Sequence, residues 1–593
     1  MVAAAGCAIP AIRSQSPENG PAAPISTRLV GEITRPVGMQ TAEVEAVGLV
    51  TSLAGTGSDP LPSLERSALI DDMQARGVES PNQVLASGNT AIVLVRAYLR
   101  PGIQKGDRFD VEVRVPSRSE TESLRNGWLM ETRLKNVAVV NNQVHDGHVW
   151  AVASGPILTE PGARGGEDAV KLGRGRILGG GICLRDRPLG LVLKTDHQNV
   201  ANSSAVGAAI NQRFHTFQQG IKTSVATPRT NERIDLIVHP RYQDNVPRYL
   251  QVIGSLALRE TAAQRTARMT LLERQLLDPV TAAIAALRLE ALGRDGVKIL
   301  LKGIESDDHE VRFFSAEALA YLDEPKAAEP LVEAARDEPA FRVFALTALS
   351  AMDDFAAYDA LRKLLDVPSA ETRYGAFRAL WAMNPRDEMI AGEDMKGRFS
   401  LHRLDTAGPP MVHVTRSFRP EIVLFGGEPR LLSPAVLEAG KEIIVQAKSD
   451  DEVTVSKFTV GQPDQKRTVT NRLDEIIRAI AELGGSYPDV VEALQQARGQ
   501  KTLVGRLEVE AVPQAGRTYE RQTARSEKDE APEMGFRAEV TRPLPDLFPK
   551  LRSGNGDDRS LGETAIADAD GETERTVAHG DRPRRRLFGN IRR

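Results

Sequence analysis

The feature that most restricts the fold of this chain is a helical segment that repeats between about residues 261 and 395. The stretches EVRFFSAEALAYL, AFRVFALTALSAM and ETRYGAFRALWAM superimpose at steps of 30 and 31 residues, with alanine and leucine at helical spacing. Each unit continues into a second amphipathic helix, as in KAAEPLVEAARD and FAAYDALRKLLD. One helix pair cannot bury its apolar face alone, but stacked pairs can. The segment therefore predicts an all-α solenoid.

An arginine takes the same place in each clear repeat: Arg312, Arg342 and Arg373. Because it recurs with the fold, we interpret it as a residue that packs and hydrogen-bonds to the preceding turn rather than as a ligand-binding residue. A shorter, divergent unit, TAAIAALRLEALGRDGVKILLKGIES, precedes the three clear ones. Helix pairs of this period resemble HEAT-type repeats, which implies an extended surface for a protein partner.

Residues 27–260 have a different pattern, in which apolar and polar residues alternate as in half-buried strands. TAIVLVRAYL, RFDVEVRV and RIDLIVHP are examples, and turn-forming pairs with glycine separate such runs. Short helical stretches interrupt them. Strand patterns return at 418–512, together with two helices. The expected fold class is multidomain α+β, in which a β-rich core is interrupted by the all-α block at 261–417, repeats and linker together.

The loop in EAVGLVTSLAGTGSDP decides between an enzyme and a structural protein. A phosphate-binding loop needs a lysine and a hydroxyl residue after its last glycine. Here Gly57 is followed by Ser58, Asp59 and Pro60, and a carboxylate repels phosphate. Gly55 and Gly57 also lack the third glycine of a dinucleotide fingerprint. We conclude that glycine serves turn geometry in this loop and that no nucleotide cofactor binds there.

No other stretch predicts catalysis. The chain has no nucleophile elbow and no zinc-protease helix, and its two cysteines exclude a disulfide scaffold. Cys183 lies in an apolar run and is predicted to be a buried small hydrophobe. The glycines of GRGRILGGGICL predict a bulge or sheet corner. We therefore expect no enzyme activity, no cofactor and no metal site, and a net charge of −4 gives no basic field for nucleic acid.

The two ends of the chain are expected to lack a packed core. In residues 1–26, Ala4-Ala5-Gly6-Cys7 has the form of a bacterial lipoprotein cleavage site, but the apolar region that should precede it is missing. Two alternatives stay open: a start placed downstream of the true one, with lipidation at Cys7, or an Ala-rich disordered start. Residues 513–593 are polar, charged and almost free of aromatic side chains, so a disordered tail is predicted.

Taken in order, several segments resemble bacterial flagellar P-ring proteins. The first is VEAVGLVTSLAGTGSD; the second is NTAIVLVRAYLRPGIQKGDRFDVEVRVPSRSETESLRNGWLMETRLK. The hallmarks of the second fall on Pro101, Gly106, Asp110, Val111, Ser123, Leu124, Arg125, Gly127 and Leu129. DGHVWAVASGPI matches the family with Trp150 where tyrosine is usual. The resemblance stops where the repeats begin, and it resumes at EIVLFGGEPRLLSPAVLEAGKEIIV and through the last helix pair.

The resemblance covers roughly 27–260 and 418–512, and it implies a structural function. P-ring proteins assemble in the periplasm into a closed ring around the flagellar rod, next to the L ring, as a bushing for the shaft. The implied partners are copies of the same chain, rod and L-ring proteins, with outer-membrane association only through a lipid anchor. The inserted solenoid would add an unknown protein partner. The rival hypothesis is a periplasmic adaptor unrelated to motility, with the solenoid as its binding module.

Two loops, at 48–59 and 123–134, are expected to contact neighbouring subunits, because glycine lets backbones approach closely. The candidate contact residues are Gly48, Gly55, Gly57, Asp59, Arg125 and Gly127.

Overall fold

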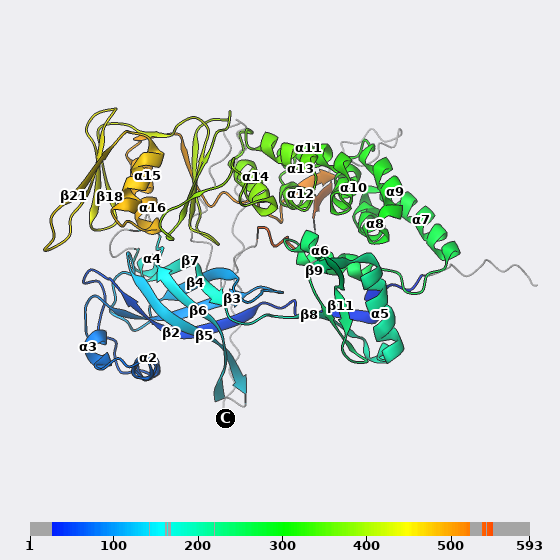
Figure 1. Cartoon of the computed structure of the whole chain (residues 1–593), viewed down its shortest axis with the longest axis horizontal. Coiled ribbons are helices and arrows are strands. Elements are labelled where there is room, and N and C mark those ends of the chain that lie inside the picture. The colour runs from blue at the N-terminus through cyan, green and yellow to red at the C-terminus, as the bar shows by residue number, and fades with distance from the viewer. Residues whose placement is uncertain are drawn as a thin grey trace, which may run out of the picture. The chain divides into compact units, whose positions relative to one another are not determined.

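The structure is a computed structural model. It describes residues 27–140, 143–160, 163, 168–218, 220–521, 536–540 and 542–548. Cys7, and with it the proposed lipidation site, lies outside the described residues. Within them, the predicted fold class is confirmed: a β-rich α+β region, a block of helical repeats and a second strand-rich region follow one another (Figure 1).

Six antiparallel strands close into a barrel in the order β2-β3-β4-β7-β6-β5. They are β2 Ala42–Thr51, β3 Ala91–Leu99, β4 Arg108–Arg114, β5 Trp128–Val140, β6 Gln143–Pro156 and β7 Arg174–Cys183. Alternate residues of β4, namely Phe109, Val111 and Val113, are buried in the barrel core, as the period of two predicts. The bulge predicted in β7 is confirmed, because its register with β4 shifts between Phe109 and Val111. Cys183 is fully buried, as expected.

Small elements surround the barrel. A separate cluster packs α2 and α3 on β2, through Leu69, Met73 and Leu85. A four-stranded sheet in the order β1-β8-β12-β11 combines one strand that precedes the barrel with three that follow it, and helices surround this sheet. The bounds are α1 Val30–Ile33, β1 Thr34–Val37, α2 Leu64–Ala75, α3 Pro81–Leu85, α4 Ala169–Leu172, β8 Leu189–Leu193, α5 Val200–Arg213, β9 His215–Gln218, β10 Ile221–Ser224, β11 Ala226–Pro228, β12 Arg233–Leu236 and α6 Val246–Gly254.

Helices fill residues 262–383. They are α7 Ala262–Leu276, α8 Pro279–Leu292, α9 Arg294–Ile304, α10 His309–Tyr321, α11 Ala328–Asp337, α12 Arg342–Ser350, α13 Phe355–Leu364 and α14 Ala370–Met383. The pairs α8/α9, α10/α11 and α12/α13 are complete repeats. The third clear unit of the sequence is the single helix α14, and strands follow it where a second helix was expected. We call α8, α10, α12 and α14 the first helices, because each opens a unit.

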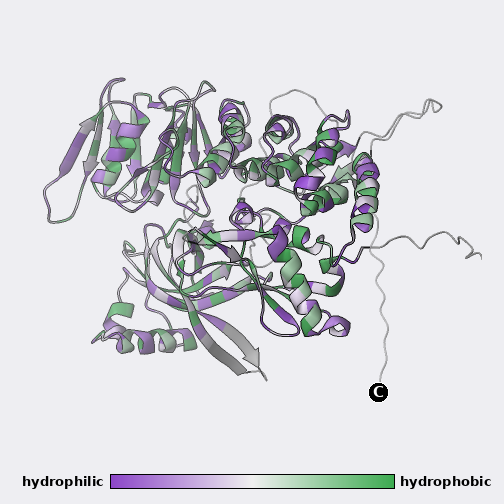
Figure 2. Ribbon diagram, turned by 45° about the vertical axis from the view of Figure 1, so that its right-hand side comes forward, coloured by the Kyte–Doolittle hydropathy of each residue, from purple (hydrophilic) through white to green (hydrophobic). Residues whose placement is uncertain are grey.

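The interpretation of the repeated arginines is confirmed by their hydrogen bonds. Nε of Arg342 donates to the Ala335 carbonyl at 2.9 Å, and Nε of Arg373 donates to the Leu365 carbonyl at 2.9 Å. Nη1 of Arg312 donates to the Ser306 carbonyl at 2.9 Å. In each repeat this arginine therefore satisfies a backbone carbonyl near the end of the helix before it. Figure 2 shows the apolar residues of these helices and of the barrel strands in green.

The second strand-rich region begins earlier than the sequence indicated. A five-stranded sheet in the order β13-β14-β16-β15-β23 includes three strands from residues 393–414, which had been assigned to the repeat block and its linker. A four-stranded meander, β18-β19-β20-β21, and two helices complete the region. The bounds are β13 Glu393–Asp394, β14 Ser400–Leu404, β15 Met411–Val414, β16 Glu421–Phe425, β17 Arg430–Leu431, β18 Ala435–Ala439, β19 Ile443–Ala447, β20 Val453–Lys457, β21 Gln465–Val469, α15 Leu473–Glu482, α16 Tyr487–Gly499, β22 Leu503–Val504 and β23 Arg506–Val509.

Folded structure extends beyond residue 513, where the sequence analysis placed the start of the disordered tail. Its described part contains two paired strands, β24 Thr518–Arg521 and β25 Phe536–Glu539. Tyr519, Leu547 and Phe548 are buried in the same core as the repeats. The mean composition of residues 513–593 is polar, so it does not reveal the few apolar residues that are buried. Residues 522–535 and 549–593 lie outside the described part of the chain.

Candidate functional site

Two loops that are far apart in the sequence lie against each other beside the barrel. The first, residues 52–62, follows β2, and the second, residues 115–127, precedes β5. The Thr56 hydroxyl donates to the Ser123 carbonyl at 2.8 Å, and the Glu122 amide donates to the Thr56 carbonyl at 2.9 Å. Ser58 and Thr121 share a hydroxyl hydrogen bond of 3.0 Å. The structure therefore brings together most of the residues predicted as subunit contacts, and we call these segments the paired loops.

Three of the candidate glycines are packing positions. A Cβ on Gly57 would lie 2.1 Å from the Thr90 carbonyl oxygen, a backbone atom that cannot move aside. A Cβ on Gly127 would lie 2.6 Å from Cγ1 of Val50, and one on Gly48, inside β2, would lie 2.8 Å from Oγ1 of Thr132. These glycines let backbone and side chains approach closely within one subunit.

Of the other candidate residues, two are exposed and one contacts residues outside the paired loops. Gly55 is exposed, has a φ of 79° and would meet no atom within 4 Å if it carried a Cβ. Asp59 is exposed and lies 3.4 Å from Nη2 of Arg66. Arg125 donates to the Ala163 carbonyl at 2.8 Å and lies 3.5 Å from the carboxylate of Glu492 on α16. Arg125 therefore joins the paired loops to the second strand-rich region.

Exposed apolar side chains, which were not among the residues predicted from the sequence, lie near these loops. Leu61 and Leu64 are 60% and 87% exposed, at the end of the first loop and the start of α2. Trp128 and Met130 are 44% and 46% exposed, at the start of β5 directly after the second loop. The signal was present, because Trp128 and Met130 take alternate positions of a strand whose intervening Leu129 is buried. Large exposed apolar side chains are therefore found at both paired loops.

A second joint between the barrel and the later region is built on Asp110. Its carboxylate accepts hydrogen bonds from the Gly179 amide at 2.8 Å and the Phe418 amide at 2.7 Å. Gly179 has a φ of 57°, and a Cβ there would lie 3.0 Å from the Phe418 carbonyl. Burial raises the pKa of Asp110 to about 6, although the two amide hydrogen bonds oppose that rise. Asp110 appeared in the sequence analysis only as a family hallmark, and its partner at 418 could not be inferred from spacing.

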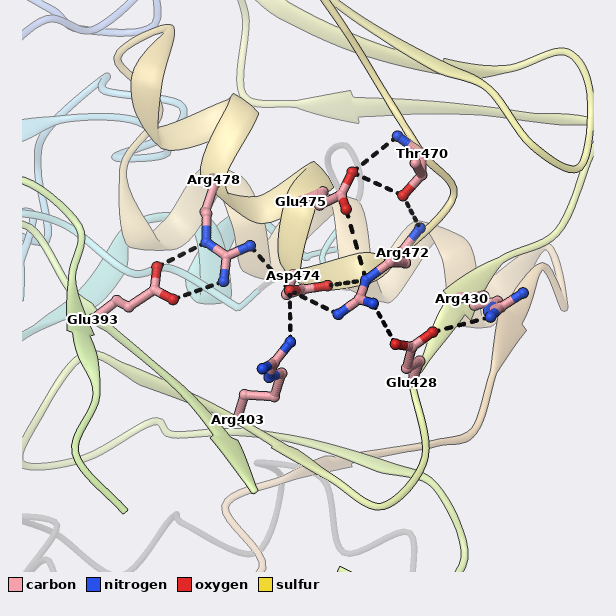
Figure 3. A network of polar contacts seen from close by, with 9 residues as sticks. All are labelled: Glu393, Arg403, Glu428, Arg430, Thr470, Arg472, Asp474, Glu475 and Arg478. Carbon is pink, nitrogen blue, oxygen red and sulfur yellow. Dashed lines mark hydrogen bonds and ion pairs between the residues drawn. The ribbon is translucent and has the colours of Figure 1, made fainter. Parts of the chain in front are cut away.

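A surface network joins strand β13 to the first turn of α15 (Figure 3). Asp474 is 5% exposed and accepts hydrogen bonds from Arg472 at 3.2 Å and Arg478 at 2.9 Å. Arg478 also forms two hydrogen bonds of 2.7 Å with Glu393. Burial would raise the pKa of Asp474, but the arginine hydrogen bonds outweigh it and the pKa is lowered. The network is structural, since every carboxylate named here is paired with arginine.

The described residues contain no group of three or more potential metal ligands. None of the described helices combines the length and the apolar character needed to cross a bilayer.

His413 is a buried titratable residue with a structural role. Its ring stacks on that of Tyr374, with 3.6 Å between the ring centroids, and it accepts a hydrogen bond from the Ala511 amide at 3.0 Å. Burial lowers its pKa to about 3, so the ring stays neutral and acts as a hydrogen-bond acceptor.

Comparisons with known proteins agree with the two-part architecture. Residues 29–275 match the family model of the flagellar P-ring protein, and residues 270–343 match that of HEAT repeats. The resemblance to P-ring proteins and the insertion of HEAT-type repeats are thus confirmed.

Curated relatives described as flagellar P-ring proteins occur in several bacteria. The relative from Thermotoga maritima is 28% identical over 243 residues, which are 38% of this chain and 66% of the relative. The relative from Geotalea uraniireducens is 28% identical over 40% of this chain and 62% of its own length. The relative from Anaeromyxobacter dehalogenans 2CP-C is 29% identical over 59% of this chain and 90% of its own length. The chain thus spans slightly less than two thirds of the first two relatives.

Among solved structures, the complex of CpcE and CpcF of phycocyanin lyase from Nostoc aligns with 21% of this chain and 84% of its own. The identity is 22% and the TM-score is 0.18.

Proposed function

We propose that this chain, which resembles flagellar P-ring proteins across its barrel, is a subunit of the periplasmic P ring and acts as a non-enzymatic bushing around the flagellar rod. The observation that carries the proposal is the family match over residues 29–275, which includes the whole barrel and both paired loops. The implied partners are further copies of the chain and the proteins of the rod and the L ring. The solenoid is proposed to hold an additional protein of the basal body or cell envelope.

The paired loops support ring formation by their chemistry. A closed ring needs a heterologous contact, in which one surface of a subunit meets a different surface of its neighbour. Exposed apolar side chains lie in the first loop, at Leu61, and directly after the two loops, at Leu64, Trp128 and Met130. The loop backbone is held in place by hydrogen bonds and close glycine packing. A rigid, partly apolar contact suits a bearing, which must keep its shape while the shaft turns.

The proposal is tested by imaging hook–basal bodies purified from cells whose copy of this chain carries a tag after residue 550. We expect tag-directed gold or antibody on rings threaded by the rod. Intact basal bodies without tag, with the protein elsewhere in the envelope, would contradict the ring proposal and leave the periplasmic adaptor as the better hypothesis.

The role of the loop glycines is tested separately by Gly57→Ala. The added methyl group would lie 2.1 Å from a backbone oxygen, so the loop must shift. We expect a loss of about 1–2 kcal/mol in stability, with the barrel still folded, and fewer rings in basal-body preparations. Circular dichroism and ring counts are the measurements.

Gly88→Ala is the matched control for Gly57→Ala. A Cβ on Gly88 would meet only the Gly55 Cα, at an ordinary 3.8 Å, so neither stability nor ring number should change. Equal ring numbers for wild type and Gly57→Ala would show that the shape of the first loop does not matter for assembly.

A further inference from the structure

The described tail residues 513–521, 536–540 and 542–548, here called the strap, lie on the repeat helices. Arg517 donates to Glu371 of α14 at 2.6 and 2.8 Å. Arg521 donates to Glu310 of α10 at 2.6 and 2.8 Å. Three strap arginines pair with carboxylates of first helices, and the third pair is Arg542 with Glu317 of α10, at 2.6 Å.

Two of the three carboxylates that receive these arginines are buried. The side chains of Glu310 and Glu317 are 2% and 1% exposed, and that of Glu371 is 23% exposed. A buried carboxylate without a cation is costly, so this row is a site that requires positively charged partners. Glu317 also pairs with Arg248 and Glu371 with Arg342, so each of these two carboxylates has one cation from the folded body and one from the strap.

Aromatic contacts accompany the charges. Tyr519 donates a short hydrogen bond to Glu310, and its ring lies 4.7 Å from that of Phe341 at the start of α12. The Arg542 guanidinium lies over the Phe314 ring at 4.5 Å. Arginine and tyrosine are the side chains that dominate protein interfaces, because each combines a flat apolar face with polar groups.

The strap continues to the region before the repeats. The Leu547 amide donates to the Asp244 carbonyl at 3.1 Å, and the Val246 amide donates to Asp546 at 2.9 Å. The segment thus reaches from α14 past α10 to the start of α6. The strap thus occupies part of the surface of the solenoid, for which the sequence analysis expected an external protein partner.

We propose that the first-helix face of the repeats is a binding site for an extended segment bearing arginine and an aromatic residue, and that the strap occupies this site in cis. A partner of the same chemistry binds only by displacing the strap. The inference rests on the proposed role of the solenoid in partner binding. It adds the chemistry of the partner and explains why the binding site of an unbound subunit is covered by its own strap.

The test uses the full chain with a specific protease site inserted within residues 522–535, so that cleavage breaks none of the contacts described above. The probe is a fluorescent peptide of residues 536–548, followed by anisotropy at submicromolar protein after overnight incubation. A tethered ligand competes at an effective concentration in the millimolar range, and cleavage lowers this to the solution concentration. We expect the cleaved protein to bind the peptide at least tenfold more tightly than the intact chain.

Peptide variants test the recognised chemistry without any change to the protein fold. An Arg542→Gln peptide should bind at least tenfold more weakly, because it cannot pair with Glu317. A Glu539→Gln peptide is the control and should bind like the parent, because Glu539 is exposed. Equal affinity before and after cleavage, no binding to the cleaved protein, or equal affinity of the Arg542→Gln peptide would each overturn the inference. The imaging test of the ring proposal does not depend on these binding results, so a failure of that proposal can be distinguished from a failure of the strap inference.

Discussion

Replacing Arg248 with methionine is expected to lower the free energy of unfolding of the repeat region by about 3–5 kcal/mol. The guanidinium of this α6 residue lies between two buried carboxylates, 2.5 Å from Glu290 and 2.7 Å from Glu317. The three side chains are 4%, 0% and 1% exposed. Without the cation of Arg248, the carboxylate of Glu290 still accepts a hydrogen bond from the hydroxyl of Tyr242. Glu317 still pairs with Arg542. Scanning calorimetry of the full chain measures the loss.

Arg265→Met is the matched control, since Arg265 pairs with Asp295 on the surface, where the side chains are 42% and 54% exposed. An exposed pair contributes at most about 1 kcal/mol. If the two methionine variants unfolded at the same temperature, the buried network would not hold α6 to the repeats.

The second large effect is a dependence of stability on pH that originates at Asp110. Its pKa in the folded protein is about 6, above the ordinary value for an aspartate. Between about pH 4 and pH 6 the folded state therefore binds more protons than the unfolded state, and stability falls as the pH rises. We expect the contribution of the Asp110–Phe418 joint to the free energy of unfolding to fall by about 2 kcal/mol across this range. This is less than the shift alone corresponds to, because the half-buried carboxylate remains partly hydrated.

The comparison that isolates Asp110 is Asp110→Asn, which cannot titrate. Unfolding temperatures of both proteins are measured from pH 4 to pH 7.5. The difference between them should change in favour of the asparagine variant as the pH rises, and level off above about pH 7. Parallel curves would show that Asp110 titrates at its ordinary pKa and that burial does not perturb it.

Local patterns predicted much of this molecule. The repeat period located the first helices, and the recurrence of Arg312, Arg342 and Arg373 indicated their structural role, because both follow from contacts between neighbours in the chain. The alternation in RFDVEVR predicted a strand with one buried face, which is now β4 of the barrel. The glycine loops were identified, although the partner of each glycine was not.

Contacts over long sequence separations were beyond these patterns. Glu310 and Arg521 are 211 residues apart, and Asp110 and Phe418 are 308 apart. The repeat block was interpreted from the sequence as an insertion that interrupts the β-rich core, whereas Arg248 of α6 is buried against α8 and α10 in one continuous core. A deletion of residues 262–410 would therefore remove both partners of Arg248, and with them strands β13 and β14 of the later sheet.

The sequence by itself determined the element types, the repeat and the family resemblance, since each of these depends on residues within a few turns or strands of one another. Only the tertiary structure decided that the tail covers the repeats and that Asp110 joins two regions. A polar segment with few anchors looks disordered by composition, because composition averages over the segment. Folding depends instead on a few side chains, such as Tyr519 and Arg542, and on the buried carboxylates that receive them.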